Sequence, residues 1–87
     1  MPFTRASAVI YELGQMIGFF GAVKEGLDGI TPEMKASLDD YQEKCKKFAE
    51  EELVNKAVFL VTDSQEKRWI ELMDEGVMWM KKLGLIV

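Results

Sequence analysis

Apolar side chains recur at intervals of three and four residues along the first part of the chain. Val9, Leu13, Met16 and Phe20 lead this series. Such spacing gives a helix one apolar side, which a protein buries against its other elements. The pattern therefore predicts a helix over residues 4–25.

Small residues occupy the opposite side of this predicted helix. At about 100° per residue, Gly14, Gly18 and Gly21 share that side with Ser7 and Tyr11. Each glycine costs about 1 kcal/mol relative to alanine in a helix interior, so three of them indicate a packing or binding reason. One interpretation is close contact with another helix, because two backbones can approach where side chains are missing. The other is a flat ligand that lies on the glycines against the Tyr11 ring.

The second predicted helix has a clear start. Thr31 supplies an N-cap, Pro32 takes the first helical position, and Glu33 adds early negative charge. Apolar positions continue at helical spacing, so we expect this helix to cover residues 32–61. Residues 57–61 also have the β-branched and aromatic character of a strand. Because a lone strand has no partner, we assign them to the end of the helix.

A third helix is predicted over residues 64–83. At the preceding break, Thr62 with Gln65, or Asp63 with Glu66, has the spacing of a capping box. The apolar stripe of this helix consists of residues at helical spacing, namely Ile70, Met73, Val77 and Met80. The chain is therefore expected to be all-α.

The length and composition favour one domain that associates with copies of itself. We expect a single helical domain over residues 1–87. A chain this short buries only about 60–65% of the surface that it exposes when unfolded. Because 48% of its residues are hydrophobic, the apolar excess favours cover by further copies, and so a homo-oligomer.

The net charge limits the classes of partner that the chain can bind, and the cysteine content indicates its cellular compartment. A formal net charge of −4 argues against a broad interaction with duplex nucleic acid or an anionic membrane. Cys45, the single cysteine, has no internal disulfide partner, which favours a cytoplasmic location. Glu12 and Gln15 interrupt the apolar stretch over residues 6–23, so we treat it as part of the fold rather than as a signal peptide or a bilayer span.

The residue types present favour binding over catalysis. Without histidine and with one cysteine, the chain lacks the usual zinc ligand sets and the Ser-His or Cys-His pairs of nucleophilic enzymes. We expect no catalytic site, no metal and no cofactor. Tyr11 offers a ring that can stack on a base, and Lys24 or Arg68 offers a positive charge for a phosphate. Since Lys24 does not share the helix side of Tyr11, a joint pocket requires a second protomer.

The third predicted helix also carries a pattern of a known phage protein family. It reads Asp-Ser-Gln-Glu-Lys-Arg over residues 63–68 and Leu-Met-Asp-Glu-Gly-Val-Met-Trp over residues 72–79. This pattern resembles the C-terminal helix of the cyclic-nucleotide sponges known as anti-CBASS protein two. The matching residues are Ser64, Glu66, Asp74, Glu75, Met78 and Trp79. The match covers about a quarter of the chain, and Gln65 stands where the family has an arginine.

The resemblance implies a short first helix and two longer antiparallel helices, assembled into a homo-oligomer for which a hexamer is one candidate. It also implies a bacteriophage immune-evasion protein in the host cytoplasm. Such a protein binds cyclic oligonucleotide second messengers, cyclic dinucleotides such as cGAMP among them, without cleaving them, and so blocks activation of a CBASS effector. The candidate ligand-binding residues are Ser7, Tyr11, Gly14, Lys24 and Arg68.

Two other hypotheses remain open. The chain is alternatively a small helical inhibitor that binds a host protein surface through Tyr11, the glycine side and its tryptophans. It is otherwise a structural subunit of a helical bundle. Two residues distinguish the three hypotheses: a nucleotide sponge needs both Tyr11 and Lys24, an inhibitor does not depend on Lys24, and a structural subunit needs neither.

Overall fold

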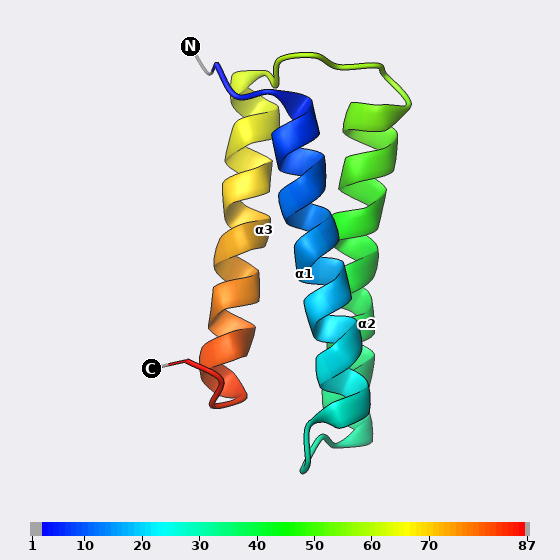
Figure 1. Cartoon of the computed structure of the whole chain (residues 1–87), viewed down its shortest axis with the longest axis vertical. Coiled ribbons are helices and arrows are strands. Elements are labelled where there is room, and N and C mark those ends of the chain that lie inside the picture. Colours follow the sequence, from blue (N-terminus) through cyan, green and yellow to red (C-terminus); the bar gives the residue numbers. More distant parts are fainter. Residues whose placement is uncertain (1–2, 87) are drawn as a thin grey trace.

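Three α-helices and one π-helical turn make up the computed structural model, which describes residues 3–86 (Figure 1). The helices are α1 (Ala6–Gly26), α2 (Pro32–Lys47) and α3 (Asp63–Lys82), and the turn η1 (Phe48–Val54) continues α2. Together they form a bundle with extents of 41 × 26 × 16 Å. The all-α prediction is confirmed for the described residues, and residues 1, 2 and 87 of the predicted domain lie outside them.

The buried side of α1 is the side that its apolar spacing predicts. The buried residues are Ala6, Val9, Leu13, Met16, Phe20 and Val23. The prediction of a short first helix is wrong, because α1 has 21 residues and α3 has 20. By length and composition alone, α1 is also a candidate membrane span. The side of α1 that packs in the core of the bundle also has to be apolar, so a core helix has the same composition.

Both later helices begin at side-chain caps that the sequence indicates. The Thr31 hydroxyl oxygen accepts a hydrogen bond from the Met34 N–H at 3.1 Å. At α3, the capping box is the one between Thr62 and Gln65. The Thr62 hydroxyl oxygen accepts from the Gln65 N–H at 3.1 Å, and the Gln65 side-chain oxygen accepts from the Thr62 N–H at 2.9 Å. These bonds satisfy donors that have no helical partner, and so they fix where each helix starts.

The second helix ends at Val54, so the prediction that it covers residues 32–61 is wrong. In η1 the hydrogen bonds reach back five residues, and the Asn55 N–H donates to the Glu50 carbonyl at 2.7 Å. The backbone then turns at Ala57, whose φ of 51° is left-handed. A helix cannot continue through such a residue.

Residues 57–61 leave the helix because they find a partner elsewhere in the chain. The Ala6 N–H donates to the Phe59 carbonyl at 2.8 Å, and the Val61 N–H donates to the Thr4 carbonyl at 3.0 Å. This short extended pairing joins the segment before α1 to the segment before α3. The strand-like character of the sequence there was therefore informative, although the pairing amounts to an isolated bridge rather than a sheet.

Tyr41 of α2 lies at the centre of the core. Its ring packs edge-on against Phe20 of α1, with the ring centroids 5.4 Å apart. Its hydroxyl donates a hydrogen bond to the Leu72 carbonyl of α3 at 2.6 Å. One side chain therefore connects all three helices. Burial raises the pKa of Tyr41 and the pKa of nearby Cys45 above their ordinary values.

The side of α3 that faces the bundle differs from its predicted apolar stripe. Gln65, Leu72 and Gly76 are buried. Ile70 and Val77, two members of the predicted stripe, remain 47% and 37% exposed. The absence of a side chain at Gly76 explains the difference, because it lets the backbone of α3 approach the core closely.

Candidate binding site

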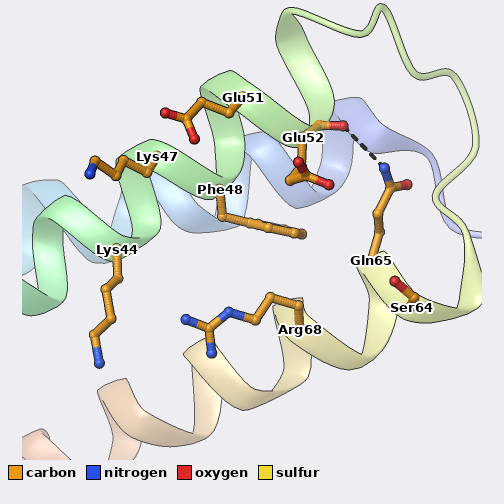
Figure 2. A pocket seen from close by; sticks show the side chains of 8 residues that line it. All are labelled: Lys44, Lys47, Phe48, Glu51, Glu52, Ser64, Gln65 and Arg68. Atoms are coloured by element: carbon orange, nitrogen blue, oxygen red, sulfur yellow. Dashed lines mark hydrogen bonds between the residues drawn. The ribbon is translucent and has the colours of Figure 1, made fainter.

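A pocket of about 380 Å³ opens between α3 and the segment formed by α2 and η1 (Figure 2). Its walls are formed by Lys44, Lys47, Phe48, Glu51, Glu52, Ser64, Gln65 and Arg68. This volume lies near the lower end of the range for small-molecule sites, about 300–1,000 Å³. The pocket therefore has room for a small ligand, or for part of a larger one.

Three cationic side chains line this pocket, two from α2 and one from α3. Lys44 forms an ion pair with Glu75 at 2.8 Å, and Arg68 forms one with Glu71 at 3.5 Å. Within residues 3–86, Lys47 forms no ion pair. Solvent-exposed ion pairs contribute only about 0–1 kcal/mol. An anionic ligand could therefore displace the two carboxylates at little cost.

Two carboxylates offset part of this positive charge. Glu51 and Glu52 also line the pocket. Glu52 is already paired with Lys56, one helical turn further on, at 3.1 Å. The lining thus holds three positive and two negative side chains, a local excess of one positive charge on a chain whose formal net charge is −4.

Phe48 and Gln65 determine the shape of the pocket. Figure 2 shows the Phe48 ring extending from η1 into the space between Glu52 and Arg68. The Gln65 side-chain amide donates a hydrogen bond to the Glu52 carbonyl at 3.1 Å. This bond ties the first turn of α3 to η1, and it therefore fixes the distance between the two walls at that end.

The first turn of α3 contributes a partial positive charge. The first N–H groups of a helix have no helical acceptor, and the helix dipole places positive charge at this end. The hydroxyl-bearing Ser64 lines the pocket here. Asp63 and Glu66 lie in the same turn and offset part of that charge. The strongest anion-binding groups are therefore the three cationic side chains.

Three of the predicted ligand-binding residues lie together on the open side of α1. Ser7, Tyr11 and Gly14 are exposed, and Tyr11 keeps 65% of its surface. Apart from its chain neighbours and the backbone of its own helix, a Cβ atom added at Gly14 or Gly18 would meet no atom within 4 Å. Close helix packing within one chain therefore does not explain these glycines.

The two predicted cations lie elsewhere. Lys24 forms an ion pair with Asp39 of α2. It stands 13 residues after Tyr11, which corresponds to roughly 20 Å along the helix. Arg68 lines the pocket between α2 and α3. The structure thus places Tyr11, Lys24 and Arg68 at three separate positions in one chain.

Sequence reasoning missed three residues that line the pocket, namely Lys44, Lys47 and Phe48. In the sequence the lysines fit the solvated side of an amphipathic helix, and Phe48 continues its apolar stripe. The available signal was their spacing of three and four residues, which any amphipathic helix also shows. Their relation to Arg68 depends on how α3 packs, and a pattern within α2 carries no information about that.

No protein-family model, no curated protein and no solved structure matches this chain. The features of this chain that bear on function are the pocket, the open side of α1 and the pattern of residues in α3.

Proposed function

We propose that the protein binds cyclic oligonucleotide second messengers and holds them without cleaving them, as a phage-encoded sponge in the host cytoplasm. The observation that carries the proposal is that Arg68 shares one pocket with Lys44, Lys47 and Phe48. Arg68 is the last residue of the first of the two α3 segments, residues 63–68, that resemble the sponge family. The proposal therefore joins the sequence pattern and the pocket at the same end of α3.

The three cations provide what a phosphodiester needs. The guanidinium of Arg68 can donate two parallel hydrogen bonds to phosphate oxygens, and Lys44 and Lys47 add point charges from the opposite wall. Phosphates on one ligand can thus contact both walls at once. In this binding mode Lys44 and Arg68 exchange their carboxylate partners for the phosphate.

The bases of the ligand require aromatic or planar surfaces. The guanidinium plane of Arg68 lies on the pocket and can stack on a nucleobase, whereas Phe48 is 7% exposed and packs in the core, so it offers a ligand only a small part of its ring. A pocket of about 380 Å³ encloses part of a cyclic dinucleotide, and the remainder projects from it. A second copy of the chain would cover that remainder, with Tyr11 as the exposed aromatic ring that it can offer.

The proposal includes an assembled form with α2 and α3 antiparallel. In support, contacts between them run in opposite order along the chain: Glu52 bonds to Gln65, whereas the earlier Lys44 pairs with the later Glu75. The homo-oligomer, with a hexamer as one candidate, is supported by the apolar side chains that one chain leaves exposed.

Calorimetric titration with a panel of cyclic di- and trinucleotides, 3′,3′-cGAMP included, tests this function. We expect saturable binding of at least one member and recovery of that ligand intact after the complex is denatured. Absence of binding to every member contradicts the proposal. Recovery of a cleaved ligand contradicts the sponge mechanism and indicates an enzyme.

Substitutions locate the site. Arg68→Ala should weaken binding by at least about tenfold, because a hydrogen bond to a charged group contributes roughly 1.5–3 kcal/mol. Lys47→Ala should act in the same direction. Lys46→Ala is its matched control, since Lys46 is an exposed neighbour on α2 that does not line the pocket. Equal affinities for Lys46→Ala and Lys47→Ala argue against the pocket.

The open side of α1 favours a second candidate function, an inhibitor that covers a host protein surface. Tyr11 and Phe19 are exposed there, and exposed aromatic side chains are typical anchors of protein interfaces. Tyr11→Ala should then abolish capture of a host protein, while Arg68→Ala should leave it intact. If the unmodified protein captures no host protein, this second candidate is wrong.

A further inference from the structure

Two hydrogen bonds made by lining residues connect the two walls of the pocket. Near the start of α3, the Gln65 amide donates to the Glu52 carbonyl at 3.1 Å (Figure 2). Further along α3, Glu75 accepts from Lys44 of α2 at 2.8 Å. Gln65 is buried, whereas Lys44 keeps 45% of its side chain exposed. The first bond is therefore a fixed part of the fold, and the second is open to exchange with a ligand.

Glu75 takes the place at Lys44 that an anionic ligand needs. Lys44 lines the pocket, and Glu75 pairs with its ammonium group from α3. Carboxylate and phosphate oxygens bind an ammonium group through the same kind of charge-assisted hydrogen bond. The ammonium group has three donors, but two anions held on it at once would repel each other. The Glu75 carboxylate and a phosphate therefore compete for Lys44.

The second ion pair at the pocket is a weaker competitor. Glu71 lies 3.5 Å from Arg68 and keeps 54% of its side chain exposed, whereas Glu75 keeps 26%. A shorter ion pair that is less exposed to solvent is also less screened. The Arg68–Glu71 pair joins residues of one helix, so it does not connect the two walls. Glu75 is thus the carboxylate that a ligand has most work to displace.

We propose that Glu75 is an internal competitor of the ligand and sets how tightly the pocket binds anions. The identity of the ligand is taken from the proposed function, on which this inference rests. In the free protein Glu75 neutralises Lys44, and in the complex a phosphate replaces it. An anion that binds lysine no better than a carboxylate does gains nothing by this exchange. The pocket therefore stays available for a ligand whose phosphates contact both walls.

The affinity for 3′,3′-cGAMP tests the competition. Glu75→Gln preserves the size of the side chain and removes its charge, so it should tighten binding by about threefold to fivefold. Asp74→Asn is the matched control, because Asp74 is exposed and forms no ion pair within residues 3–86. It makes the same change in net charge without releasing Lys44, and it should alter the affinity by less than about twofold.

Two results of this comparison overturn the proposal. Equal effects of Glu75→Gln and Asp74→Asn would mean that only the net charge matters. Weaker binding in Glu75→Gln would mean that Glu75 positions Lys44 for the ligand rather than competing with it.

A crystal structure of the complex tests the exchange directly. We expect the Lys44 Nζ atom within about 3 Å of a phosphate oxygen and no longer paired with Glu75. A complex in which Lys44 remains paired with Glu75, without contact to the ligand, overturns the proposal.

Inorganic pyrophosphate separates this inference from the proposed function, because it offers phosphate groups without bases. If it binds Glu75→Gln more tightly than Asp74→Asn while no cyclic nucleotide binds, Glu75 is a competitor and the sponge function is wrong. If cyclic nucleotides bind the unmodified protein and Glu75→Gln equally well, the sponge function is retained and the role of Glu75 is wrong. If neither pyrophosphate nor any cyclic nucleotide binds, both are wrong.

Discussion

The Tyr41 hydroxyl donates a hydrogen bond to the Leu72 carbonyl at 2.6 Å, deep between α2 and α3. The Tyr41 side chain is completely buried, and its hydroxyl also lies where a side chain at position 76 would have to go. The Tyr41 hydroxyl thus sets how closely α3 approaches α2 beside Gly76, where α3 has no side chain.

The close approach at Gly76 makes substitution there costly. A Cβ atom at this position would lie 2.5 Å from the Tyr41 hydroxyl oxygen and 2.7 Å from a methyl carbon of Met16. We expect Gly76→Ala to lower the free energy of unfolding by about 1–3 kcal/mol in urea denaturation. Gly14→Ala is the control and should raise it by up to about 1 kcal/mol, because that position is open.

A double-mutant cycle identifies the atom responsible. Tyr41→Phe removes the hydroxyl that the new methyl group meets, so Gly76→Ala should cost less in the Tyr41→Phe background. Additive effects would contradict a direct clash between the two groups.

The left-handed backbone at Ala57 offers a stabilising change. An alanine with φ of 51° is strained by about 1–2 kcal/mol, and glycine adopts this conformation freely. Part of that gain is lost because glycine is more flexible when unfolded. We expect Ala57→Gly to raise the melting temperature, with a net gain of up to about 1 kcal/mol. Ala36→Gly, in the interior of α2, should lower it by a similar amount.

Gln65 connects α3 to η1 through its side chain. Its oxygen caps the Thr62 N–H, and its amide group donates to the Glu52 carbonyl. We expect Gln65→Ala to lower the free energy of unfolding by about 1–3 kcal/mol, because buried partners lose their hydrogen bonds. Gln15→Ala, an exposed glutamine of α1, should change it by less than about 0.5 kcal/mol. Similar effects of the two changes would contradict this role for Gln65.

Alkaline pH should weaken the fold through Tyr41. Burial, with a smaller contribution from Cys45, raises the pKa of Tyr41 above its ordinary value of 10.0. Above pH 10 the unfolded chain therefore releases a proton that the folded chain retains, and stability is lost as the pH rises. The stability difference between the unmodified protein and Tyr41→Phe should then shrink by up to about 1.4 kcal/mol per pH unit. A difference that stays constant from pH 8 to pH 11 would refute this.

Local patterns in the sequence were sufficient for part of the fold. The spacing of Val9, Leu13 and Phe20 identified the buried side of α1, and Thr31 identified the start of α2. At α3 the sequence offered two capping boxes, and the structure uses the one that begins at Thr62. Both signals act between residues within one or two turns of each other. They depend only on helix geometry and on donors that lack a partner, so the sequence carries them directly.

The candidate site could be predicted only in part. The sequence singled out Arg68 as a possible phosphate ligand, and the pocket contains it. The sequence did not indicate that Lys44 and Lys47 lie across from it. Those residues are more than 20 positions earlier in the chain, and their proximity depends on the packing of α3 against α2.

Contacts between distant residues decided the rest. η1, which continues α2, stops at Val54 because the segment that follows pairs with Thr4 and Ala6, more than 50 residues earlier. α3 turns Leu72 rather than Ile70 inward because Gly76 leaves space for the Tyr41 hydroxyl. The energy of such contacts depends on which surfaces meet in three dimensions. For that reason the tertiary structure, and not the periodicity of the chain, determined the pocket.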